Sequence, residues 1–111
     1  MSDLYTYKAT CVRVQDGDSV VLDIQLGFNM AMLNQKIRLF GINTPEIRGA
    51  ERPQGLIAAA RLSGLIEGKE VYLRSHKDRS GKYGRWLGTI YIDDININKL
   101  LLQEGLAEIY E

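Results

Sequence analysis

The sequence predicts a small protein of mainly β structure with two helices. Three segments rich in β-branched and aromatic residues follow one another near the N-terminus, with short turns between them. A segment with helical spacing comes next, and two further strand-like segments and a short helical one complete the chain. The 111 residues are enough for one domain with a working core.

The first three strands are expected to form an antiparallel meander. The segments are Tyr5–Val14, Val20–Leu26 and Ala31–Ile42. The first turn contains Gly17, which we expect to adopt a positive φ between two aspartates, and Gly27 and Asn29 mark the second. Strands joined by such short links pair with their neighbours in sequence.

The remainder of the chain is expected to supply two helices and two more strands. After a loop from Gly41 to Gly55, a helix is predicted over Gln54–Gly68, with one apolar stripe formed by Leu56, Ala59, Ala60, Leu62 and Ile66. Strands are expected at residues 70–74 and 85–92, separated by a polar loop in which His76 is exposed. The second helix, 97–105, would start at Asn96 or Asn98 and stop at Gly105. Five strands with a helix after the third predict a partly closed barrel of the oligonucleotide/oligosaccharide-binding type.

Composition is that of an ordinary globular domain, with 45% apolar and 25% charged residues. Fourteen basic residues balance fourteen acidic ones, so net charge alone gives no reason to expect a nucleic-acid partner. The lone Cys11 excludes an internal disulfide and a cysteine-based zinc site, and we expect it to be buried. No segment has the length of a membrane span and no signal peptide is recognisable, so we expect no membrane association and a cytoplasmic location unless a signal has been removed.

Four short features could carry chemistry: Asp16-Gly17-Asp18, Arg38, the run from Asn43 to Glu46, and Arg85. Each has an ordinary alternative. The first is a common turn sequence, "NTPE" could start an Asx turn, and arginines beside strands are usually solvated.

In a meander, the first turn and the end of the third strand lie in the same region of the barrel. Asp18, the side-chain oxygen of Asn43 and the carbonyl of Thr44 could then bind one hard cation such as Ca²⁺, with water completing the shell. Glu46 could hold one such water and accept its proton.

Two arginines beside this site favour a phosphodiester substrate, because planar guanidinium groups match the oxygens of a phosphate that gains charge. The segment Arg74–Arg85 contains five Lys or Arg against one Asp, with Tyr83 among them. Basic residues beside an aromatic are typical of a groove for single-stranded nucleic acid, although a solvated loop is the alternative.

At this point the chain resembles the staphylococcal nuclease (thermonuclease) family. "VQDGDSV", "RLFGINTPE", "KYGRWLGTIYI" and "LLQEGLAEIY" occur in the order and spacing of that family, over most of the chain. The resemblance implies a single nuclease domain over residues 1–111. It also implies a Ca²⁺-dependent endonuclease that acts as a monomer on DNA and RNA, preferably single-stranded, and leaves 3′-phosphate ends.

The resemblance also implies roles for particular residues. Asp18, Asn43 and Thr44 would bind the metal, with Asp16 beside these ligands. Glu46 would be the general base, and Arg38 and Arg85 would hold the scissile phosphate. Lys82 and Tyr83 match positions that contact a terminal phosphate of bound nucleotide.

This chain departs from the family pattern in three places. Asn43 stands where the family has a second metal-binding carboxylate, so we expect weaker Ca²⁺ binding, or use of Mn²⁺ or another divalent ion. The segment Gly27–Asn34 differs from the family, and the sequence ends at Glu111, where fuller members continue into another helix. Two alternatives to an active nuclease therefore stay open: a catalytically impaired barrel that binds nucleic acid or a partner without cleaving it, and an unrelated phosphate- or saccharide-binding barrel.

Overall fold

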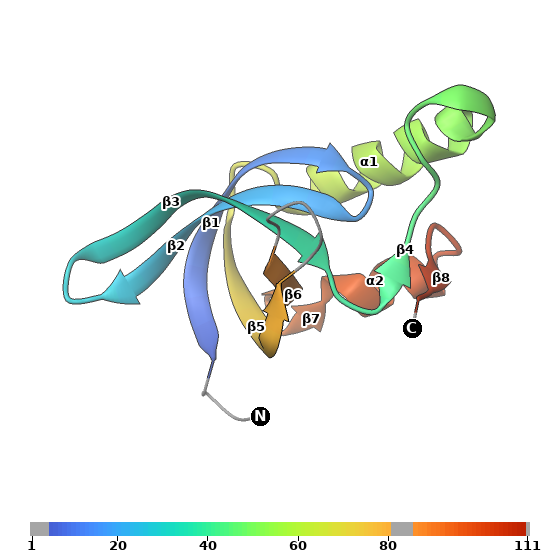
Figure 1. The fold of residues 1–111 in the computed structure, drawn as a ribbon. Helices are drawn as coiled ribbons and strands as arrows, with labels where there is room; N and C mark the ends of the chain where they lie inside the picture. Colours follow the sequence, from blue (N-terminus) through green and yellow to red (C-terminus); the bar gives the residue numbers. More distant parts are fainter. Residues whose placement is uncertain (1–4, 81–85, 111) are drawn as a thin grey trace.

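The computed structural model describes residues 5–80 and 86–110, and of residues 77–80 it describes the backbone alone. These residues form a β-barrel with two helices (Figure 1). The elements are β1 (Thr6–Asp16), β2 (Ser19–Gly27), β3 (Met30–Leu39), β4 (Ile42–Asn43), the 3₁₀-helix η1 (Gly49–Glu51), α1 (Arg52–Ile66), β5 (Glu70–Ser80), β6 (Trp86–Ile92), β7 (Ile95–Asn96), α2 (Ile97–Gln103) and β8 (Glu108–Ile109).

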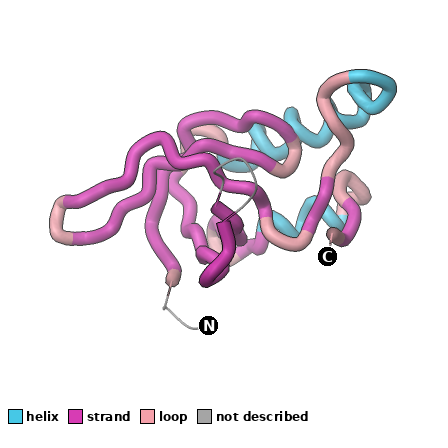
Figure 2. The backbone as a smooth tube through the Cα atoms, viewed as in Figure 1, coloured by secondary structure: helices cyan, strands magenta, loops and turns pink. Residues whose placement is uncertain are grey.

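The barrel is made by five strands, β1, β2, β3, β5 and β6. The large sheet has the order β3-β2-β1-β5-β6-β7, with antiparallel neighbours throughout, and a parallel pairing of β3 with β6 closes it. Figure 2 shows the long barrel strands on one side of the molecule, and the short strands β4 and β8 beside the helical segments on the other. The mixed barrel with a helix after the third strand confirms the predicted fold class.

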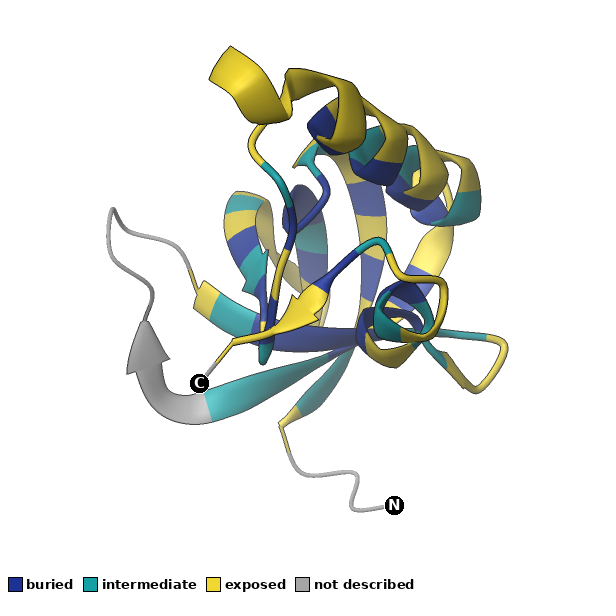
Figure 3. Ribbon diagram, turned by 90° about the vertical axis from the view of Figure 1, so that its right-hand side faces the viewer, coloured by how far each residue is buried: buried dark blue, intermediate teal, exposed yellow. Residues whose placement is uncertain are grey.

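The core fills the barrel and the space beneath α1 (Figure 3). Alternate residues of β2 and β3, including Leu22 and Ile37, point into it and are fully buried. Cys11 is buried there as predicted, and this burial raises the pKa of its thiol to about 11. The thiol therefore stays protonated at neutral pH.

Helix α1 packs on the barrel through a face that matches the predicted stripe only in part. Its buried residues are Gly55, Ala58, Leu62 and Ile66, whereas Leu56 is 44% exposed and Ala60 is exposed. Burial of Leu62 and Ile66 was therefore predicted correctly, whereas Gly55 and Ala58 were missed. The helix packs closely there, and close packing favours glycine and alanine at the contact.

The segment after residue 74 corrects a second expectation. Strand β5 continues to Ser80, and His76 is half-buried within it rather than exposed in a loop. Its ring stacks on Phe40, with 3.6 Å between the ring centroids, and its Nε2 lies 2.9 Å from Oγ1 of Thr89. These contacts come from residues distant in sequence, so the polar composition of the segment could not reveal them.

At the second helix, the structure decides between the two proposed starting residues. Asn96 is the N-cap of α2, since its side chain accepts a hydrogen bond of 3.0 Å from the amide of Lys99. Asn98 is instead buried, and its side chain binds the backbone of β6 and of Phe40.

The β2–β3 hairpin extends beyond the barrel as a two-stranded arm (Figure 1). Its outer part exposes five large apolar side chains, and Phe28 at the tip is 97% exposed. The five are Leu26, Phe28, Met30, Met32 and Leu33. Among the described residues no helix is long and apolar enough to span a bilayer.

The exposure pattern predicts different effects on stability for two substitutions on the same hairpin. Phe28→Ser should leave the free energy of unfolding almost unchanged, because the ring buries no surface in the fold. Leu22→Ala should lower it by about 2–5 kcal/mol, because it leaves a cavity in the core. Urea unfolding monitored by circular dichroism measures both. A large loss of stability for Phe28→Ser would contradict the described arm.

Candidate active site

The turn between β1 and β2 depends on a close approach to neighbouring segments. The side chain of Asp16 accepts a hydrogen bond of 3.1 Å from the amide of Asp18. Gly17 does not have the predicted positive φ. It is needed for space instead, since a Cβ atom there would lie 2.7 Å from both Oγ1 of Thr44 and Cβ of Ala58.

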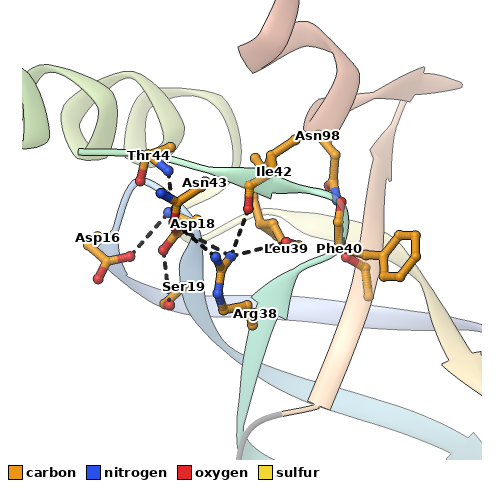
Figure 4. A network of polar contacts seen from close by, with 11 residues as sticks. Asp16, Asp18, Ser19, Arg38, Leu39, Phe40, Ile42, Asn43, Thr44 and Asn98 are labelled. Carbon is orange, nitrogen blue, oxygen red and sulfur yellow. Dashed lines mark hydrogen bonds and ion pairs between the residues drawn. The ribbon is translucent and has the colours of Figure 1, made fainter. Parts of the chain in front are cut away.

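The carboxylate of Asp18 joins this turn to β3 and β4 (Figure 4). Its Oδ2 accepts a hydrogen bond of 3.1 Å from the amide of Thr44 and lies 3.4 Å from Nη1 of Arg38. Its Oδ1 lies 3.4 Å from the hydroxyl of Ser19. Only 11% of the Asp18 side chain is exposed, so these contacts compensate a largely buried charge.

Arg38 is the most highly connected side chain of the site. Its Nη1 donates to the carbonyls of Ile42 and Leu39 at 3.0 and 3.3 Å, and its Nη2 donates to Oδ1 of Asn43 at 3.1 Å. The guanidinium carbon also lies 5.3 Å from the ring centroid of Tyr110.

Tyr110 reaches this position through a contact that the sequence did not indicate. Short strands β4 and β8 pair with each other, and the amide of Tyr110 donates to the carbonyl of Gly41 at 2.9 Å. The end of the described chain therefore lies against the candidate site.

Glu46 lies in the loop between β4 and η1, with its side chain exposed. Its amide donates to Oε1 of Glu51 at 3.2 Å, and Arg52 binds the carbonyl of the next residue, Ile47, at 3.0 Å. Gly55 of α1 packs against the loop so closely that a methyl group there would overlap the carbonyl oxygen of Glu46. Helix α1 thus fixes the backbone that carries the predicted general base.

These elements surround one open cavity of about 360 Å³ with a mixed charge. Three acidic and three basic side chains line it together with two amides. The lining residues are Gln15, Asp16, Asp18, Lys36, Arg38, Asn43, Glu46 and Arg48. Burial and a hydrogen bond with Asp18 raise the pKa of Asp16 to about 6, so the cavity is less negative in weak acid.

Two basic residues of this cavity were missed from the sequence. Lys36 stands two residues before Arg38, so the period of a β-strand puts both on one face. Arg48 stands two residues after Glu46 in the same loop. Both residues thus stand two positions from a predicted site residue, but charged residues of strands and loops were interpreted as solvated.

The oxygens present suit a hard divalent cation held weakly. Asp18 and Asn43 both contact the guanidinium of Arg38, so a carboxylate oxygen and an amide oxygen converge on one positively charged group. Thr44, beside them, would add a carbonyl oxygen, and its buried Oγ1 has no hydrogen-bond partner among residues 5–80 and 86–110. No group of three or more His, Cys, Asp or Glu that could hold a metal occurs in that part of the chain. The donor set is therefore all oxygen, with few charges.

The structure thus brings six of the nine predicted site residues together. They are Asp16, Asp18, Arg38, Asn43, Thr44 and Glu46, of which all but Thr44 line the cavity. The other three, Lys82, Tyr83 and Arg85, lie outside the described residues.

Comparison with known proteins identifies the family. A family described as "Staphylococcal nuclease homologue" matches residues 36–111. The chain belongs to the staphylococcal nuclease family. The matched range contains Arg38, Asn43, Thr44 and Glu46 and starts after Asp18, so it does not itself cover the aspartate turn.

Three curated relatives of the chain are named as nucleases. The SPbeta prophage-derived endonuclease YokF of Bacillus subtilis is 33% identical over 104 residues, which cover 90% of this chain and 33% of that protein. The thermonuclease of Staphylococcus intermedius is 30% identical over 98 residues, covering 86% of this chain and 55% of the relative. Endonuclease YncB of Bacillus subtilis is 34% identical over 77 residues, or 66% of this chain and 36% of the relative. The chain therefore spans between a third and just over half of the length of these relatives.

The packing of α1 against the Glu46 loop predicts different effects for two glycines of the same helix. Gly55→Ala should destabilise the protein by about 1–3 kcal/mol, since the methyl group displaces the loop. Gly64→Ala should stabilise it by roughly 1 kcal/mol, because its Cβ would meet no atom within 4 Å and alanine favours the helix. Urea unfolding of both variants tests this. Equal stabilisation by the two substitutions would mean that Gly55 does not contact the loop.

Proposed function

We propose that this chain is a phosphodiester hydrolase that cleaves nucleic acid with the help of a divalent cation. One observation carries the proposal: in a chain of the staphylococcal nuclease family, Asp18, Arg38, Asn43 and Glu46 line one cavity. The names of the relatives support hydrolysis of phosphodiesters as the reaction class.

In this proposal Arg38 binds the scissile phosphate. Its two terminal nitrogens already point to acceptor oxygens of Asp18 and Asn43, so a phosphate with two oxygens could replace these partners. The guanidinium would then stabilise the negative charge that grows on the phosphate in the transition state. Arg85 would assist as the second arginine, a role assigned from the resemblance alone.

Glu46 would be the general base in the same reaction. Its carboxylate is exposed at the cavity while its backbone is fixed by Glu51 and α1, so the side chain can accept a proton from a water held there. Asp18, the Asn43 amide oxygen and the Thr44 carbonyl would hold the cation, which when bound supplies charge neutralisation for the phosphate. Our finer proposals are Ca²⁺ as the cation, single-stranded DNA and RNA as substrates, and 3′-phosphate products.

The general-base role predicts a large and specific loss of activity. Glu46→Gln should reduce cleavage of heat-denatured DNA by about 10²- to 10⁴-fold at saturating Ca²⁺, because the amide cannot accept the proton. Cleavage is measured over a Ca²⁺ titration with an EDTA blank. Glu70→Gln, an exposed glutamate of β5 outside the cavity lining, is the matched control and should retain activity. Equal activity of the two variants would remove Glu46 from the mechanism.

The neutral amide of Asn43 leads to a prediction about affinity: a negative charge added at this position should improve cation binding. Asn43→Asp should tighten Ca²⁺ binding on the order of tenfold, because a second carboxylate then faces the cation. Isothermal titration calorimetry measures the affinity without reference to activity. Asn29→Asp adds the same charge at the exposed turn of the arm, where a positive φ of 63° also suits aspartate, and should have little effect. If both variants bind Ca²⁺ alike, Asn43 is not a ligand.

Asn43 is also the observation that favours a second candidate, a barrel that binds nucleic acid without cleaving it. The loss of one ligand charge could abolish hydrolysis and still leave the cavity intact. Absence of Ca²⁺-dependent cleavage by the folded protein, with single-stranded DNA binding retained, would support this candidate against the hydrolase.

A further inference from the structure

Lys36 and Arg48 differ from Arg38 because their side chains have no polar partner among residues 5–80 and 86–110. Both side chains are exposed and line the cavity, and in the described part of the chain neither makes a side-chain hydrogen bond or ion pair. Arg38, by contrast, has 14% of its side chain exposed and contacts four oxygens. The cavity thus contains one arginine held by the fold and two basic groups available to a ligand.

The spacing of Lys36 and Arg38 suits the backbone of a nucleic acid. Lys36 pairs with Val21 and Arg38 pairs with Ser19 without an irregularity between them, so the two side chains lie on the same face of β3. Two residues of a strand span about 6.6 Å. This distance is similar to the separation of successive phosphates in an extended single strand.

Arg48 enters the cavity from the loop that follows β4. Its backbone is extended, with φ −144° and ψ 161°. The residue before it, Ile47, is half-buried, whereas Glu46 and Arg48 on either side of Ile47 are exposed. Glu46 and Arg48 both line the cavity.

We propose that Lys36 and Arg48 bind the two phosphates that flank the phosphate held by Arg38. The site would then take three consecutive phosphates of a single strand and would favour internal bonds over the bond of a dinucleotide. This inference rests on the proposed function, because it takes Arg38 as the group that binds the central phosphate. Lysine and arginine contacts to phosphate contribute affinity without reading sequence.

The test is equilibrium binding of a fluorescent single-stranded oligonucleotide with three phosphates, measured by anisotropy in EDTA so that no cleavage occurs. Lys36→Ala and Arg48→Ala should each weaken binding about tenfold, which is the effect of losing roughly 1.4 kcal/mol. Each should also reduce the slope of log affinity against log salt by about 0.7. Lys69→Ala, which removes an exposed lysine that is not part of the cavity lining, is the control and should change neither quantity.

Binding of two modified oligonucleotides shows which flanking phosphate Lys36 contacts and which one Arg48 contacts. In each, a neutral methylphosphonate replaces one flanking phosphate, on the 5′ or the 3′ side. If Lys36 binds one flanking phosphate, Lys36→Ala should no longer weaken binding of the ligand that lacks it, and Arg48→Ala should lose its effect with the other ligand. Equal losses on all three ligands, or losses no greater than for Lys69→Ala, would overturn the proposal.

This binding experiment and the Ca²⁺-dependent cleavage assay described above together separate the inference from the proposed hydrolase. The coupling pattern without Ca²⁺-dependent cleavage would support the two phosphate sites and contradict the hydrolase. Cleavage without the coupling pattern would contradict the two phosphate sites alone.

Discussion

The arrangement of the site depends on the guanidinium of Arg38. It donates to the carbonyls of Leu39 and Ile42 at the turn from β3 to β4, and it also contacts Asn43 and Asp18. Without this positive charge, the largely buried carboxylate of Asp18 would be uncompensated, which is strongly destabilising. The contacts that shape the turn are therefore the same ones that bring the candidate ligands together.

Close packing at two glycines determines how the neighbouring segments of the site approach one another. Gly17 lets the β1–β2 turn approach Thr44 and α1, and Gly55 lets α1 approach the Glu46 loop. The net charge is zero, yet the cavity collects three acidic and three basic side chains. The cavity therefore has a high density of charges of both signs that the overall composition does not reveal.

The parts of the fold predicted from sequence are those set by local chemistry. Runs of β-branched, aromatic and other apolar residues predicted the first three strands, and Asn96 was one of two residues proposed to start the second helix. The missed features depend on distant partners: β5, which contains His76, pairs with β6, and the His76 ring stacks on Phe40. Tyr110 approaches Arg38 through the β4–β8 pairing. At the site, motif chemistry predicted the candidate ligands and Arg38, which lie together, whereas Lys36 and Arg48 were recognised only as parts of the same cavity.

The proposed cation site consists of Asp18, Asn43 and Thr44, next to Arg38. The most direct test is the broadening of backbone amide signals by Mn²⁺ in a ¹⁵N-labelled sample. We expect the amides of Asp18 and Thr44 to broaden first, at substoichiometric Mn²⁺, and the effect to be reversed by excess Ca²⁺ and absent in Asp18→Asn. If broadening begins elsewhere, or if Asp18→Asn leaves it unchanged, the assigned cation site is wrong.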